Sequence, residues 1–109
     1  MAIPHSPFTQ MDLTWDKLIE QVLLRVNAYA RHPAERLHGH RFLVAKDARR
    51  NRGYFVTAGN FGRAEFKVAV HEAQAAGLDA SVLYVYGRTA TYSGSGIHFV
   101  KLDDIGVTP

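Results

Sequence analysis

The stretch 81–87, SVLYVYG, constrains the fold more than any other part of the sequence. Its apolar residues follow one another without the polar alternation of a strand that has one face in water. Such a run is typical of a strand that is buried on both faces. It therefore predicts a central strand, around which the rest of the chain must be arranged.

A long amphipathic helix is predicted before this strand. Asp12 and Thr14 are candidate N-caps, and Pro33 is expected to stop the helix. The apolar stripe between them, at spacings of three and four residues, consists of Trp15, Leu18, Ile19, Val22, Val26 and Tyr29. This spacing predicts one buried helical face about five turns long.

The remaining elements follow from local composition. Branched and aromatic residues predict strands at 41–46 and 53–58, joined as an antiparallel hairpin in which Asn51 and Gly53 are available for positive φ. An alanine-rich segment at 59–77 predicts a second helix with Asn60 as its cap and Gly77 at its C-terminal end. Two more strands are predicted at 88–93 and 97–102, with glycines 94 and 96 in the turn between them.

The predicted order is therefore α-β-β-α-β-β-β, in an α+β domain. We expect two layers, in which two helices pack on one mostly antiparallel sheet of about five strands, with one parallel pairing across the second helix. A length of 109 residues fits one domain. Its predicted boundaries are a flexible N-terminal arm at 1–11, the domain at 12–102 and a short acidic tail at 103–109.

The composition narrows the chemistry and the location. The chain has no cysteine, which excludes disulfides and thiolate catalysis and fits a reducing compartment. The N-terminus lacks the pattern of a signal peptide, and no apolar stretch approaches the roughly 20 residues of a membrane span. We expect a cytoplasmic protein that does not associate with membranes.

Positive charge is concentrated in one short segment. Residues 41–53 contain five basic side chains and one acidic one, whereas the segments before and after them are close to neutral. The predicted hairpin places Arg49, Arg50 and Arg52 at or beside its turn. A guanidinium group pairs with phosphate oxygens through two donors and stacks on bases, so a basic hairpin favours a polyanionic partner. The alternative is a turn that is charged only to stay soluble.

Other residues are candidates to extend this surface. We expect supporting phosphate contacts from Lys46 and Arg41, and from Arg63 and Lys67 on the exposed face of the second helix. Tyr54 flanks the basic segment. Tyr84 and Tyr86 share one face of their strand because they are two residues apart, and an open face would offer aromatic rings to unpaired bases. The alternative is that these tyrosines pack beneath a helix.

Motifs for catalysis and for metal binding are weak. His38 and His40 form an H-x-H pair without further ligands at metal spacing, so we predict no metal site and no cofactor. Glu65 and Lys67 match part of a nuclease motif, but that motif needs both residues on one strand, and here they fall within a predicted helix. We assign no catalytic residues.

The sequence thus predicts a small non-enzymatic domain that binds DNA or RNA through the basic hairpin 41–53. A second hypothesis is a protein-binding accessory or inhibitor module, of the type that phages and plasmids encode, with the same basic surface against an acidic partner. A third is a small hydrolase with an unidentified site. The edge strand predicted at 88–93 is a candidate for pairing with a second copy of the chain.

Overall fold

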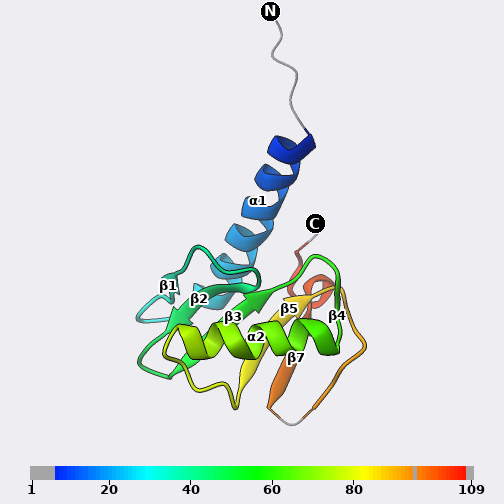
Figure 1. Cartoon of the computed structure of the whole chain (residues 1–109). Helices are drawn as coiled ribbons and strands as arrows, with labels where there is room; N and C mark the ends of the chain where they lie inside the picture. The colour runs from blue at the N-terminus through cyan, green and yellow to red at the C-terminus, as the bar shows by residue number, and fades with distance from the viewer. Residues whose placement is uncertain (1–6, 95, 108–109) are drawn as a thin grey trace, which may run out of the picture.

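The structure is a computed structural model that describes residues 7–94 and 96–107, with side chains from Trp15 onward. Figure 1 shows a twisted sheet with α2 across its front and α1 leading away towards the N-terminus. The elements in chain order are α1 (Pro7–Asn27), β1 (Glu35–Arg36), β2 (Leu43–Asp47), β3 (Arg52–Val56), β4 (Asn60–Phe61), α2 (Arg63–Ala75), β5 (Leu83–Gly87), β6 (Thr89–Ala90), β7 (Ile97–Lys101) and the 3₁₀ helix η1 (Leu102–Ile105).

Five strands form the main sheet, in the order β1-β2-β3-β5-β7. β1, β2 and β3 pair antiparallel, and β3–β5 and β5–β7 pair parallel. The predicted α+β class, with two helices and a five-stranded sheet, is confirmed, and the sheet is mixed. β5 lies between β3 and β7, so the interior position predicted for the apolar run is also confirmed.

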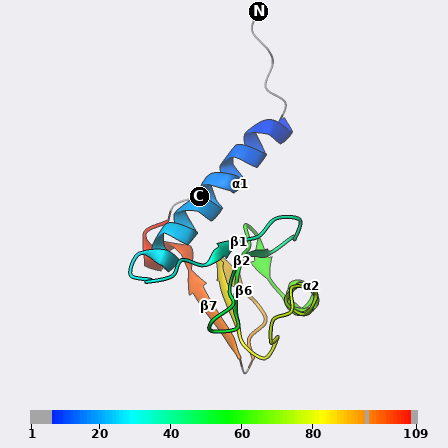
Figure 2. The same ribbon diagram turned by 90° about the vertical axis from the view of Figure 1, so that its left-hand side faces the viewer.

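The two helices lie on opposite faces of the sheet (Figure 2). Ile19 and Val22 of α1 share a buried cluster with Val44 and Val56. A second cluster, on the other face, packs α2 against the sheet and contains Phe42, Leu43, Phe55, Phe61, Ala69, Ala73, Leu78, Leu83 and Val85. Because neighbouring residues along a strand point to opposite faces, the unbroken apolar run requires a cover on each side. The two layers expected from the sequence are in fact three.

Helix α1 differs from the prediction at both ends. It begins at Pro7, within the segment predicted as an arm, and residues 1–6 of that arm lie outside the described residues. It ends at Asn27 rather than at Pro33, because the Asn27 side chain accepts a hydrogen bond from the Ala34 backbone N–H (2.9 Å) and holds the returning chain. Tyr29 therefore lies beyond the helix and is fully exposed instead of completing the apolar stripe.

The hairpin and the end of α2 follow the local sequence signals. Asn51 has φ of +52° in the β2–β3 turn, as predicted, whereas Gly53 has no positive φ and is required for space, since a Cβ there would lie 3.0 Å from the Leu78 side chain. Gly77 has φ of +76°, and its N–H donates to the Gln74 carbonyl (3.0 Å). This is the left-handed C-terminal turn expected from a glycine that follows a helix.

Asn60 is not the cap of α2. It lies in β4, which pairs in parallel with β6 in a separate two-stranded sheet. Its side chain donates to the Thr91 hydroxyl (2.7 Å) and accepts from the Thr89 hydroxyl (3.2 Å). Gly62 precedes the helix instead, and its N–H donates to the Glu65 carboxylate (2.8 Å).

The C-terminal third departs furthest from the prediction. Residues 88–93 contribute only the two residues of β6, and they form no edge of the main sheet. β7 pairs parallel with β5, not antiparallel with a neighbour across the glycine turn. The predicted acidic tail, 103–109, is packed as far as Val107: Val107 is buried beside α1 together with Leu102, the residue before the tail, and Arg25 donates to the Ile105 carbonyl (2.9 Å). Residues 108–109 lie outside the described residues.

Candidate nucleic-acid interface

The β2–β3 turn, residues 48–51, is held by a carboxylate at its base. Asp47 accepts hydrogen bonds through Oδ1 from the backbone N–H groups of Arg49 (3.1 Å) and Arg50 (3.3 Å). An Asp side chain that binds the backbone two and three residues later is a common turn motif. The acidic residue of the segment therefore fixes the backbone, and both arginine side chains are exposed.

The arginine side chains of the turn remain available to a partner. Arg50 Nε lies 3.7 Å from Asp47 Oδ2, but the Arg50 side chain is 65% exposed. An exposed pair of this kind contributes about 0–1 kcal/mol, which a phosphate can replace. Arg49 forms none of the ion pairs that link side chains in the described part of the chain. The turn thus presents two guanidinium groups to solvent.

Arg52 begins a row of planar side chains that crosses three strands. Its guanidinium carbon lies 4.2 Å from the centre of the Tyr84 ring. The His98 ring stacks on Tyr84 with 4.8 Å between centres and 10° between planes. Arg52 extends from β3 and His98 from β7, the two strands that flank β5, so they occupy opposite faces of the Tyr84 ring. We call these three side chains the stacked row.

Tyr54 packs against Tyr84, the central side chain of the stacked row. Its side chain is buried, at 6% exposure, and its ring lies 6.0 Å from Tyr84 and 6.5 Å from Tyr86. Burial raises the pKa of the Tyr86 hydroxyl. The expectation that Tyr84 and Tyr86 share a face is met, and Tyr54 is a packing residue there rather than an exposed contact.

Two hollows flank Arg50 on the surface. The first, of about 180 Å³, lies on the side of α1, and its polar lining is Asn27, Arg31, His32, Asp47, Arg49, Arg50 and Tyr54. The second, of about 220 Å³, lies on the side of β5 and is lined by Arg50, Asn51, Arg52, Asp79, Ser81, Val82 and Tyr84. We call them the α1-side hollow and the β5-side hollow. Both hollows include Arg50, so they meet at the turn, and each also contains one carboxylate, Asp47 in the first and Asp79 in the second.

Sequence reasoning missed three cationic or titratable contributors to this surface. Arg31 and His32 belong to the connection after α1, and they reach the turn only because α1 ends early. His98 reaches Tyr84 because β5 and β7 are parallel and in register at these two residues. His32 is followed by Pro33 and Ala34, and His98 by Phe99 and Val100, and neither context carries a local signal of a site, so only the pairing of distant segments reveals them.

Lys46 and Arg41, predicted as supporting contacts, are less available. Lys46 is half-buried, and its Nζ lies 3.9 Å from the Glu35 carboxylate on β1. Arg41 lies before β2, at the end remote from the turn, and its guanidinium carbon is 4.9 Å from the centre of the Phe42 ring. Neither side chain lines the two hollows.

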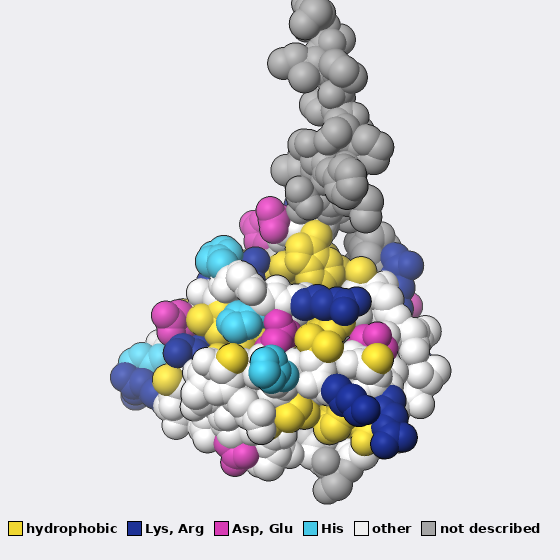
Figure 3. Space-filling view, in the orientation of Figure 1, with side chains coloured by type: hydrophobic (Ala, Val, Ile, Leu, Met, Phe, Trp, Pro, Cys, Tyr) yellow, Lys and Arg dark blue, Asp and Glu magenta, His cyan; other side chains and the backbone are white. Residues whose placement is uncertain are grey.

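Arg63 and Lys67 lie at the opposite end of the domain. Helix α2 runs back from the end of β3 to the start of β5, so its C-terminal end, not its N-terminal end, approaches the turn. The Asp79 N–H after α2 donates to the Asn51 side chain in the turn (3.0 Å). Figure 3 shows Lys and Arg side chains at the left, over the β2–β3 turn, and a separate group near the N-terminal end of α2. These two residues do not join the turn arginines.

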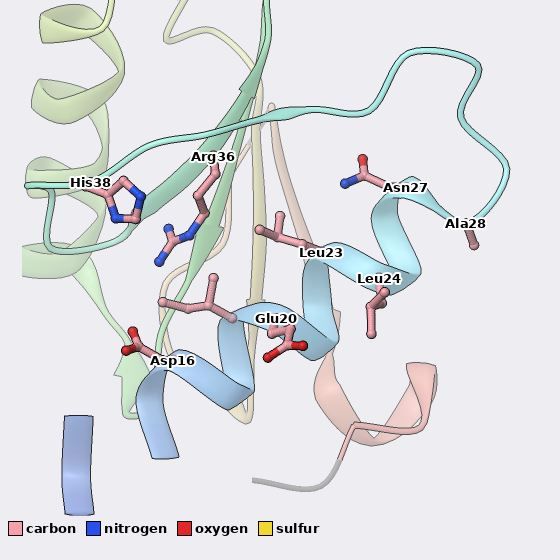
Figure 4. A pocket seen from close by; sticks show the side chains of 9 residues that line it. Asp16, Glu20, Leu23, Leu24, Asn27, Ala28, Arg36 and His38 are labelled. Atoms are coloured by element: carbon pink, nitrogen blue, oxygen red, sulfur yellow. The ribbon is translucent and has the colours of Figure 1, made fainter. Parts of the chain in front are cut away.

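The largest hollow of the three lies between α1 and β1. It measures about 560 Å³, and its walls carry Asp16 and Glu20 from α1 and Arg36 and His38 from the other side (Figure 4). The Arg36 guanidinium donates to the carbonyls of Leu37 (2.7 Å) and Val44 (2.9 Å). None of the ion pairs among the described side chains joins the acidic wall to the basic one. The arrangement therefore offers no paired acid and base.

The described residues offer neither a metal site nor a membrane-spanning helix. No group of three or more His, Asp or Glu side chains within them is placed to hold a metal ion. None of the helices in the described ranges combines the length and the apolar character that crossing a bilayer requires. Neither a protein-family model, nor a curated protein, nor a solved structure matches this chain, so its function has to be argued from its own residues.

Proposed function

We propose that this chain is a nucleic-acid-binding domain whose β2–β3 turn contacts phosphates through Arg49, Arg50 and Arg52. The observation that carries the proposal is the exposure of Arg49 and Arg50 on a turn whose carboxylate, Asp47, is engaged with the backbone. The backbone of the turn is fixed, Arg49 forms none of the ion pairs in the described part of the chain, and Arg50 forms only an exposed one; such guanidinium groups suit phosphate, which they bind through two donors.

The two hollows support the same function. Each has the cations of the turn on one wall, and the α1-side hollow adds Arg31 and His32 on the other. A phosphate in either hollow would therefore meet donors from two segments of the chain. The Asp79 carboxylate in the β5-side hollow accepts the Ser81 N–H (2.9 Å), an interaction that lowers its pKa. The lower pKa keeps this carboxylate negatively charged, so the β5-side hollow contains one anionic group beside Arg50 and Arg52.

The salt dependence of binding has a predictable size. Each phosphate contact on duplex DNA contributes about 0.9 to the slope of log affinity against log salt concentration. Three contacts predict a slope of roughly 3, which weakens binding about forty-fold between about 50 and 200 mM salt. Fluorescence anisotropy of a labelled 20-nucleotide DNA measures the slope for the duplex and for the single strand, on which three contacts predict a smaller slope of about 2.

A charge-matched pair of variants tests the location of the site. The triple variant Arg49→Ala, Arg50→Ala and Arg52→Ala removes three charges at the turn, and we expect it to abolish binding and the salt slope. A control triple variant, with Arg63, Lys67 and Arg88 replaced by alanine, removes the same charge from exposed positions at the far end. It should bind nearly as well as the unchanged protein.

Two results would refute the proposal. One is a wild-type protein that leaves DNA and RNA unbound in dilute buffer, and the other is an equal loss of binding in both triple variants. If the wild-type chain does not bind nucleic acid but binds one defined acidic protein through Arg49 and Arg50, the result would instead support the accessory or inhibitor hypothesis.

A further inference from the structure

The stacked row ends at the open edge of the sheet. β7 pairs with β5 on one side, and within the described residues no strand pairs with its other side. His98 is exposed there, although one face of its ring is covered by Tyr84. Among the described residues, no aromatic ring or guanidinium group stacks on the outer face of the His98 ring; the other end of the row is the Arg52 guanidinium, which lies in the β5-side hollow.

The row also leads away from the proposed phosphate contacts. Arg52 and Tyr84 both line the β5-side hollow, and Tyr84 contacts His98 directly. A nucleic-acid strand with a phosphate in this hollow would pass along the row towards the edge of the sheet. A planar group added beyond His98 would continue the existing stack of guanidinium, phenol and imidazole.

From this arrangement we infer that the interface takes single-stranded nucleic acid and that an unpaired base stacks on the outer face of His98. The inference rests on the proposed function and narrows it to one class of ligand. Bases in a duplex cover one another's faces, whereas bases in a single strand can turn out to stack on aromatic side chains.

An abasic strand separates stacking from charge. We compare a labelled deoxythymidine 12-mer with an abasic 12-mer of the same backbone, at one low salt concentration. Because stacking of a base on an aromatic ring typically changes affinity about five-fold to a hundred-fold, the wild-type protein should prefer the thymidine strand by that factor. His98→Ala should lose most of this preference and keep its affinity for the abasic strand.

Two further variants test whether the aromatic face of residue 98, rather than its ring nitrogens or the loss of any exposed histidine, determines the preference. His98→Phe keeps an aromatic face without the ring nitrogens, and it should restore the preference for the thymidine strand. His71→Ala removes another exposed histidine, from α2 on the opposite face of the sheet, and should bind both strands as the wild-type protein does.

The outcomes distinguish the inference from the proposed function. Equal wild-type affinity for the two strands would overturn base stacking while leaving phosphate binding in place, as would an unchanged preference in His98→Ala. Failure of the wild-type protein to bind either strand would overturn the proposed function itself. Loss of the preference in His98→Ala with its return in His98→Phe would support the inference.

Discussion

Replacing Glu72 is the most informative test of how the domain is held together. Glu72 lies on α2, is only 7% exposed and accepts hydrogen bonds from three consecutive backbone N–H groups, those of Arg41, Phe42 (2.9 Å) and Leu43 (3.2 Å). His40 Nδ1 lies 3.5 Å from its Oε2. One carboxylate therefore joins the second helix to the start of β2.

The loss of stability in Glu72→Ala can be worked out from the backbone N–H groups that this substitution leaves without an acceptor. The N–H groups of Phe42 and Leu43 belong to buried residues, so water cannot easily take the place of the carboxylate, whereas Arg41 is exposed. A hydrogen bond to a charged group contributes about 1.5–3 kcal/mol, and the burial cost of the carboxylate offsets part of this. We expect a loss of about 3 kcal/mol, a large share of the roughly 5–15 kcal/mol by which domains are stable.

Urea denaturation with an unchanged m-value measures this loss, and two variants calibrate it. Glu72→Gln keeps one carbonyl acceptor and should lose less stability than Glu72→Ala. Glu65→Ala removes a carboxylate that accepts one N–H at the start of the same helix, and it should cost about 1 kcal/mol. Two results would refute this account. One is a free energy of unfolding for Glu72→Ala within about 1 kcal/mol of the wild-type value, and the other is a higher urea midpoint for Glu72→Ala than for Glu65→Ala.

Three further predictions concern other parts of the chain. Gly96→Ala should cost about 2 kcal/mol or more in urea, since φ is +89° and a Cβ would lie 2.0 Å from the Ser81 carbonyl oxygen; a neutral result would contradict that geometry. Leu102→Ala should cost about 2–5 kcal/mol in the same assay because it empties a buried position beside α1, and an unaffected midpoint would contradict the packing of Leu102 against that helix. Burial raises the pKa of Tyr86 in the folded state, so the wild-type protein should lose stability as the pH rises above the ordinary tyrosine pKa of about 10. Tyr86→Phe should lose less stability over the same pH range. Identical pH profiles of the two proteins in denaturation experiments would exclude this contribution.

Features that depend on neighbouring residues could be predicted from the sequence. The stripe containing Leu18, Ile19 and Val22 is buried because its period is that of a helix. The left-handed residues Asn51 and Gly77 occur where a tight hairpin and a helix end require positive φ. In each case the local backbone geometry is set by residues that are close together in the sequence.

Features that depend on pairing between distant segments could not be predicted in this way. Residues 88–93 have the composition of a strand, yet two of them pair with β4 and the remainder carries the chain across to β7. A short glycine turn suggested antiparallel neighbours, but Gly96 is used for its close approach to Ser81 instead. The parallel register that brings His98 to Tyr84 therefore had no local signal.

The candidate site illustrates why charge that is clustered in the sequence need not be clustered in space. A strand advances about 3.3 Å per residue, so Arg41 lies roughly 20 Å from the turn although only the six residues 42–47 separate it from Ala48. Arg49 and Arg50 stay together because the chain reverses there, and Arg52 leaves them to stack on Tyr84. The positive surface around the turn is completed instead by Arg31 and His32, which come from the connection after α1. The candidate interface is thus a product of the fold, in which the basic segment supplies only its central part.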